Sequence, residues 1–121
     1  MANTFKVINF AAEPNSAGTP FTMYTVASST TTVVLGLILA NINTTAVTAE
    51  VELVSTTSSR GGANNVANGT SFLIKDVSIP TGSSLEILSG GKVVLEAGDK
   101  IQIDCSVADK LSGTLSIMEI T

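Results

Sequence analysis

Carboxylates are the main side chains of this chain that could do acid–base chemistry, because it has ten Asp and Glu residues, one cysteine and no histidine. Paired carboxylates hydrolyse glycosides when they face each other across a substrate. Glu50 and Glu52 are two residues apart, which in a strand makes them neighbouring surface charges on one face. Asp99, Asp104 and Asp109 do not follow the spacing of a calcium-binding loop. We therefore interpret Asp99 as a turn residue and the other two as solvated, and expect no metal site.

Other reactive residues and motifs are equally rare in this sequence. Without histidine, the sequence excludes Ser-His-Asp and Cys-His arrangements and histidine-containing zinc sites. Cys105, the only cysteine, continues the alternation of Ile101 and Ile103, which predicts a small buried apolar residue and not a nucleophile. Gly61-Gly62 and Gly90-Gly91 lack the helix and lysine of a phosphate-binding loop. We predict that the chain is not an enzyme and binds no cofactor.

Charge and hydropathy limit the classes of partner. Charged residues make up 13% of the chain, the net charge is −4, and the six basic residues are scattered, so nucleic-acid binding is not expected. The longest apolar run, Val33 to Ala40, is too short to cross a bilayer, and the segment from Met1 to Lys6 lacks the features of a signal peptide. We expect no membrane partner and a protein made in a cytoplasm. Abundant Ser, Thr and Asn suit a surface that meets other proteins, although β proteins are commonly rich in Ser and Thr, and both explanations stay open.

Period-two alternation is the main structural signal. On either side of Ala97-Gly98-Asp99, the segment from Lys92 to Cys105 alternates apolar and polar residues, which predicts two antiparallel strands joined by a tight turn. Turn signals recur at short intervals along the chain. About eight to nine short antiparallel strands predict one all-β domain over residues 1–121, a β-sandwich or jelly roll. The other expected strands are Thr4 to Phe10, Phe21 to Val26, Thr32 to Ile42, Ala46 to Val54, Ser71 to Val77, Leu85 to Leu88 and Thr114 to Ile120.

Some elements carry more detailed expectations. The segment from Thr32 to Ile42 is the most apolar and is expected to be a central strand, buried on both faces over part of its length. Gly36 in its middle indicates a bulge or a close backbone crossing. Phe72 and Ile74 are expected on one face of their strand, and Tyr24 is expected on the face opposite Phe21 and Met23. The segment from Ala108 to Gly113 is expected to be a turn or a single helical turn.

The segment from Ser55 to Thr70 contains no apolar residue larger than valine. We expect a long exposed loop or a mobile hairpin extension, and loops of this length are commonly functional or flexible. Arg60 at its tip makes the loop a contact candidate, because arginine is enriched at interface hot spots. A solvated, dispensable insertion is the alternative, and both interpretations stay open. The candidate contact residues are Arg60, Asn64, Asn65 and Asn68 of this loop, with Phe5 and Phe10 of the first strand.

Five sequence segments stand in a characteristic order along the chain: Thr25 to Leu37, Ala40 to Ile42, Ser71 to Leu85, Lys92 to Ile101 and Leu115 to Ile120. Single segments are weakly specific, because Leu-x-x-Gly-Asp-x-Ile occurs in many jelly rolls, including trimers like tumour necrosis factor. The order and spacing of the whole set are more specific. As a set they resemble a family of small virion structural proteins of tailed bacteriophages, especially phages of marine cyanobacteria.

The resemblance implies an accessory protein of the phage particle, either a capsid decoration (cement) protein or a neck or tail component. Such proteins commonly form trimers or larger rings, so the implied partners are further copies in a homotrimer and the major capsid protein or other virion proteins. The implied location is the virion, assembled in the host cytoplasm. The resemblance transfers no catalytic or binding residue, and the segment from Ser55 to Thr70 departs from the family pattern.

Low charge, abundant hydroxyls and more apolar strand faces than one core needs suggest how such a protein would act. Rigid sandwiches would bury these faces against each other and against the shell, and so hold adjacent subunits together. A receptor- or carbohydrate-binding module, at a head fibre or tail tip, is the main alternative. It would expose aromatic residues for sugar stacking, whereas most of the few aromatic residues here are expected in the core. A cytokine-like secreted trimer would need an export signal.

Overall fold

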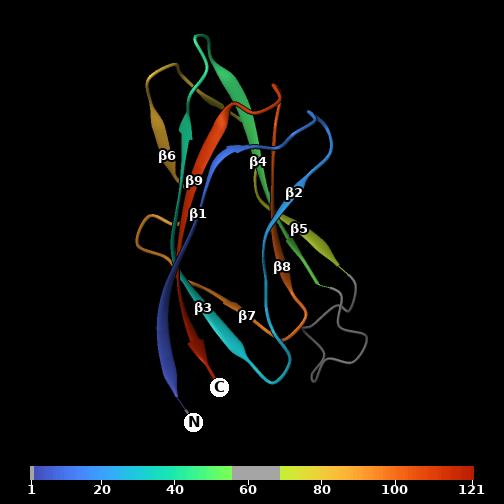
Figure 1. Ribbon diagram of the computed structural model, residues 1–121, viewed down its shortest axis with the longest axis vertical. Helices are drawn as coiled ribbons and strands as arrows, with labels where there is room; N and C mark the ends of the chain where they lie inside the picture. Colours follow the sequence, from blue (N-terminus) through green and yellow to red (C-terminus); the bar gives the residue numbers. More distant parts are fainter. Residues whose placement is uncertain (1, 56–68) are drawn as a thin grey trace.

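Nine β-strands in two sheets form the described part of the chain, residues 2–55 and 69–121, in this computed structural model (Figure 1). Sheet A has the strand order β1-β9-β3-β6, with β7 also paired to β3, and sheet B has the order β2-β8-β4-β5. All of these pairs are antiparallel, so the predicted all-β sandwich is confirmed. The strands are β1 (Asn3–Glu13), β2 (Phe21–Thr25), β3 (Thr31–Asn41), β4 (Val47–Val54), β5 (Thr70–Ile79), β6 (Ser84–Glu86), β7 (Val93–Leu95), β8 (Lys100–Cys105) and β9 (Leu111–Ile120).

The core lies between the inner faces of the two sheets. It is built by alternation: Ile101 and Ile103 of β8 point inward from sheet B, and Leu115 and Ile117 of β9 point inward from sheet A. Burying a Leu or Ile side chain of this kind stabilises a fold by about 1.5–3 kcal/mol. The other buried apolar residues are Met23, Val26, Val34, Leu37, Leu39, Val47, Ala49, Val51, Ile79, Leu95, Cys105 and Leu111.

The strand order is that of a jelly roll, in which a long antiparallel hairpin is rolled into two sheets. Its paired arms are β1 with β9, β2 with β8, β3 with β6 and β7, and β4 with β5. β6 pairs with one end of β3 and β7 with the other, so the two short strands act as halves of one interrupted strand. The pairs β3–β9 and β4–β8 then join these arms into the two layers.

The segment 92–105 crosses from one sheet to the other, so the predicted hairpin is wrong. β7 pairs with β3 in sheet A, whereas β8 pairs with β2 and β4 in sheet B. The turn itself is present: Gly98 has a φ of 88°, and the Asp99 carboxylate accepts a hydrogen bond from the Glu96 N–H at 2.9 Å. The Val26 N–H donates to the Asp99 carbonyl at 2.9 Å, which fixes this corner to the end of β2.

β3 lies inside sheet A, with β9 on one side and the two short strands β6 and β7 on the other, as expected for a central strand. Its register against β9 shifts between Val34 and Gly36, which confirms the bulge. A Cβ on Gly36 would meet nothing within 4 Å, so this glycine does not mark a close backbone crossing. The expected burial on both faces is wrong, because the outward side chains of Val33 and Leu35 are half-buried and Ile38 is exposed.

The register between β4 and β5 shifts twice, once between Ala49 and Val51 and once between Val51 and Glu52, and the second shift decides which side chains at the start of β5 face the core. Val51 pairs with Ile74 and the next residue of β4, Glu52, pairs with Phe72, so one extra residue of β5 lies between these pairs. Because a bulge reverses the alternation, Ile74 packs against the core while Phe72 is exposed. The predicted common face for Phe72 and Ile74 is therefore wrong.

The expected turn before the last strand is present. Ala108 and Asp109 form it, with Asp109 at a φ of 58°, and β9 begins at Leu111 within the segment from Ala108 to Gly113, so the turn alternative is the right one. The predicted loop from Ser55 to Thr70 falls mainly outside the described residues, and its ends are joined by a hydrogen bond from the Ser55 N–H to the Gly69 carbonyl at 2.7 Å. Within residues 2–55 and 69–121, no helix has the length and apolar character needed to cross a membrane.

Candidate interaction face

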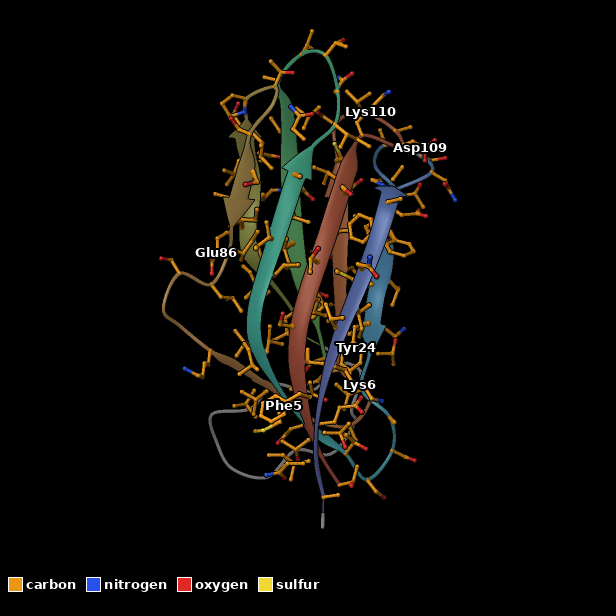
Figure 2. All side chains as sticks on the ribbon, turned by 60° about the vertical axis from the view of Figure 1, so that its left-hand side comes forward. Phe5, Lys6, Tyr24, Glu86, Asp109 and Lys110 are labelled. Carbon is orange, nitrogen blue, oxygen red and sulfur yellow. The ribbon has the colours of Figure 1, made fainter. Side chains whose placement is uncertain are left out.

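An apolar row crosses the outer face of sheet A. Directly opposed residues of neighbouring antiparallel strands share a face, and the row runs from Phe5 of β1 to Met118 of β9, then to Val33 of β3 and Val94 of β7. Phe5 is 72% exposed and Val94 is 61% exposed, at the two ends of the row. Figure 2 shows the Phe5 side chain reaching from β1 over the lower part of the sheet.

The rest of this face is nearly free of charge. Val7 and Ile38 are also exposed, at 64% and 44%. Between them β9 contributes hydroxyl side chains from its outward positions, Ser112, Thr114 and Ser116. Among the paired positions of this face in the described residues, only Glu86 of β6, opposite Ile38, carries a charge. We call the outer surface of β1, β9, β3, β6 and β7 the sheet A face.

The outer face of sheet B is charged instead. Glu50 lies opposite Asp104 and Glu52 opposite Gln102, so the two glutamates share one face as predicted. Partial burial raises the pKa of Glu52, and the negative charges of Glu50 and Asp104 raise it further. The outer face of sheet B therefore gathers acidic side chains.

A single lysine on β5 organises part of that charged surface. Lys75 Nζ lies 3.0 Å from Glu50 Oε1 and 4.6 Å from the centre of the Phe72 ring. The hydrogen bond to Glu50 is the main reason that the pKa of Lys75 is raised. Phe72, the exposed aromatic residue of this sheet, is therefore held next to a cation.

The three aspartates differ from one another in surroundings. Asp104 is buried, so its predicted solvation is wrong: its Oδ1 accepts hydrogen bonds from the Gly18 N–H at 3.1 Å and the Cys105 N–H at 2.8 Å. Asp99 is a turn residue as predicted, and it is also buried. Asp109 is exposed, as predicted.

A depression of about 190 Å³ lies beside Asp104 and is lined by Gly18, Thr48, Glu50, Asp76, Asp104, Cys105 and Ser106. The Asp104 carboxylate is satisfied by backbone donors and the Glu50 carboxylate by Lys75. Among the described residues, no three Asp, Glu or Cys side chains are grouped so that they could hold a metal ion. Cys105 is buried as predicted, and this burial raises the pKa of its thiol.

Polar side chains join the two sheets near the start of β1. The Tyr24 hydroxyl donates to Glu119 Oε2 at 2.6 Å and lies 2.8 Å from Thr32 Oγ1, and Lys6 Nζ lies 2.7 Å from Glu119 Oε1. Figure 2 labels Lys6 and Tyr24 at this end of the sandwich. The hydrogen bonds from Lys6 and Tyr24 lower the pKa of Glu119. Burial and the hydrogen bond to Glu119 raise the pKa of Tyr24 to about 12.

Tyr24 reaches this position because of a register shift between Thr22 and Tyr24 in the β2–β8 pair. The shift places Phe21 opposite Ile103 and Tyr24 opposite Ile101, so both aromatic residues pack against the core. The predicted assignment of Tyr24 and Phe21 to opposite faces is therefore wrong.

The predicted contact residues separate into three groups. Phe5 belongs to the sheet A face. Phe10 is half-buried and packs edge-on against Phe21 with ring centres 5.3 Å apart, so it serves the sandwich interior. The other candidates, Arg60, Asn64, Asn65 and Asn68, lie outside the described residues.

Sequence reasoning missed most of the sheet A face. Val33, Val94 and Met118 were not among the expected contact residues. The available signal was the exposed alternation of Phe5 and Val7, two apolar residues on one side of an edge strand. Val33 and Met118 could not be found in this way, because their face depends on the pairing of distant strands.

No protein-family model matches the chain, and no curated protein sequence matches it. Among solved structures, one similar chain comes from work described as "Bacillus endospore appendages form a novel family of disulfide-linked pili". The two chains are 18% identical with a TM-score of 0.47, and the match covers 99% of this chain and 87% of that one. A similarity at this level says nothing about what the chain does.

Proposed function

We propose that this protein is a non-enzymatic structural component of a phage particle, specifically a capsid decoration protein that binds the major capsid shell through the sheet A face. The observation that carries the proposal is the contrast between the two outer faces. One presents exposed apolar and hydroxyl side chains, with Glu86 as the charged residue among its paired positions in the described residues, and the other presents Glu50, Glu52 and Lys75.

Contact surfaces between proteins lose charged residues at their centres, and clustered exposed apolar side chains mark interaction sites. Phe5, Val7, Ile38 and Val94 fit this description because each is exposed on one continuous sheet. A sheet is also a rigid platform, so little conformational entropy is lost when it docks. These properties support a scaffold that binds by its flat side.

The mechanism is mechanical. Each copy would bury its sheet A face against the shell and bridge neighbouring capsid subunits. Copies repeated over a lattice make a weak single contact strong, because each further contact on a linked surface becomes effectively intramolecular. A neck or tail position would use the same surface against a different virion protein.

A receptor- or carbohydrate-binding module is the second candidate, and the exposure of Phe5 and Phe72 favours it, because sugar rings stack on exposed aromatic residues. The two rings lie on opposite outer faces of the sandwich, however, Phe5 on sheet A and Phe72 on sheet B. They cannot form one stacking platform, so we rank this function below shell binding.

The test is binding of purified protein to heads that were assembled without it, measured by co-sedimentation. The double variant Ile38→Ser/Val94→Ser removes two exposed apolar side chains from the sheet A face, and we expect head affinity to fall by about tenfold or more. Phe72→Ser is the matched control because it removes an exposed apolar side chain from the other sheet. It should bind heads like the unmodified protein.

Equal loss of binding in both variants would show that head binding does not depend on the sheet A face in particular, and would count against the proposal. Binding of the unmodified protein to tails but not to heads would move the same surface to a tail contact. Binding to glycans of the host surface but to neither particle part would favour the carbohydrate-binding candidate.

A further inference from the structure

β1 is the outer strand of sheet A, and among the described residues no strand pairs with its other side. Ala2 and Thr121 exchange both backbone hydrogen bonds, at 3.1 and 3.0 Å, and the same register continues from Asn3 to Phe10. In an antiparallel ladder such bonded pairs alternate with pairs whose backbone groups point away from each other. The N–H and C=O groups of Asn3, Phe5, Val7 and Asn9 therefore point to the open side of β1.

The other sheet edges are shorter or more irregular than β1 is between Asn3 and Phe10, where the one charged residue, Lys6, is paired with Glu119. The opposite edge of sheet A is interrupted, because β6 and β7 have three residues each. In sheet B, β2 has five residues, and β5 is bulged and carries Lys75 and Asp76. β1 pairs without a bulge from Asn3 to Phe10. Natural proteins usually blunt long edges with bulges, proline or charge, so a regular open edge suggests that the edge is used.

We propose that a second copy of this chain adds its own β1 to this edge, antiparallel, about a two-fold axis centred on Phe5. The hydrogen-bonding positions of the two edges then coincide: Phe5 lies opposite Phe5 of the other copy, and Asn3 lies opposite Val7 of the other copy. Pairing of Asn3 to Val7 with its symmetry mate makes about six ladder hydrogen bonds.

Charge and apolar contacts favour this register over the two adjacent ones. A two-fold axis at Lys6 would place two lysines opposite each other, which is unfavourable. An axis at Val7 would place Phe5 opposite Asn9 and Lys6 opposite Ile8. Centring on Phe5 places Lys6 opposite Thr4 and leaves the ion pair of Lys6 with Glu119 in place. β1 also contacts β2, and its N-terminal half extends away from β2 (Figure 1).

The two-fold axis of an antiparallel strand pair is perpendicular to the sheet, so both sheet A faces would point the same way. The apolar row that ends at Phe5 would continue into the second copy through Met118 and Val33 of that copy. A single strand pair buries less than the 1,200–2,000 Å² of a stable interface, so we expect a weak dimer, with a dissociation constant of about 0.1 mM. A dimer would present a doubled sheet A face to a particle, where multivalency strengthens it.

Disulfide trapping tests the register. Opposed residues of a bonded antiparallel pair have Cα atoms about 5.5 Å apart, within disulfide range. Phe5→Cys should therefore form a covalent dimer under mild oxidation, at least about tenfold faster than Asn9→Cys, whose symmetry mate lies far along the strand. Mixed Asn3→Cys and Val7→Cys proteins should form a crosslinked heterodimer. Cys105 is buried in all of these variants and in the unmodified control.

Sedimentation velocity tests the same pairing without a crosslink. The unmodified protein should pass from monomer to dimer as its concentration rises towards about 1 mM. Val7→Pro should remain monomeric, because proline removes an N–H that points to the open edge and leaves the bonds to β9 intact. Val7→Ala is the control and should still dimerise.

Equal trapping rates for Phe5→Cys and Asn9→Cys, or a monomer at all concentrations, would overturn the proposal. A trimer, as the family resemblance implies, would also overturn the proposal if the Val7→Pro variant had the same trimeric mass as the unmodified protein. These measurements need no phage head, so their failure leaves the head-binding proposal standing, and failure of head binding leaves the strand pairing standing.

Discussion

Tyr24 is one of the polar links between the two sheets, through its hydroxyl contacts with Glu119 and Thr32. Tyr24→Phe should lower the free energy of unfolding by about 1–3 kcal/mol, because it leaves the buried Thr32 hydroxyl without this partner. Urea unfolding at neutral pH measures the change. The comparison is Phe21→Tyr, which adds a hydroxyl to the other half-buried aromatic residue of β2. This added hydroxyl should not strengthen the polar contact between the two sheets.

The same tyrosine should make stability depend on alkaline pH. Its pKa is raised to about 12 in the fold, against about 10 in an unfolded chain. A raised pKa stabilises the fold fully below pH 10, and this contribution is lost as pH rises towards 12. Tyr24→Phe should lack this loss, and because the chain has one tyrosine, phenolate absorbance reports the pKa directly. A folded-state pKa near 10 would contradict the burial of this hydroxyl together with its hydrogen bond to Glu119.

Some residue environments could be predicted from the sequence and others could not. Neighbouring positions on a strand, such as Glu50 and Glu52, follow from alternation alone, and so does burial of Cys105. Burial of Asp104 depends on a hydrogen bond from Gly18, a residue 86 positions away that only the fold brings near. A turn residue such as Asp99 is recognisable, but its burial depends on how the corner packs.

Gly113 of β9 leaves room for the Phe10 ring of β1. The two residues are direct cross-strand partners, and a Cβ on Gly113 would overlap the Phe10 ring. Gly113→Ala should therefore destabilise the protein by about 1–3 kcal/mol through overpacking. Gly36→Ala is the matched control, since a Cβ there meets nothing within 4 Å, and its effect should stay within about 1 kcal/mol.

Thermal unfolding of the two alanine variants compares them directly. Phe10→Leu should recover part of the loss when added to Gly113→Ala, because residues in contact are not additive. Equal effects of the two alanine variants would mean that loss of glycine flexibility, and not the Phe10 contact, controls stability at both positions.

Strand positions were predictable because turn residues and alternation are local signals. Bulges were predictable only at Gly36, where a glycine interrupts an apolar run. The bulge between Phe72 and Ile74 has no such marker, and it reverses the alternation only as far as the second register shift, between Ile74 and Val77. The corner at 97–99 shows the other limit: Gly98 and Asp99 reverse the chain, but burial of Ile101 and Ile103 against sheet A decides which sheet the next strand joins.

The sandwich has one nearly uncharged outer face, on sheet A, and one acidic outer face, on sheet B. No segment shows this contrast by itself, because the sheet A face combines residues from five strands. Phe5, Met118 and Val33 become neighbours only when β1, β9 and β3 pair. The low overall charge was visible in the composition, but its uneven distribution between the two sheets was not.

This asymmetry predicts how head binding responds to salt. If the sheet A face makes the contact, few ion pairs form, and affinity should change less than about twofold between 0.1 and 0.5 M NaCl, because salt screens charges and not apolar burial. Co-sedimentation with heads over a salt series measures this. The double variant Glu50→Gln/Glu52→Gln, on the opposite face, should leave both affinity and salt response unchanged. A steep loss of binding with salt that this variant abolishes would place the contact on sheet B and reverse the orientation that we propose.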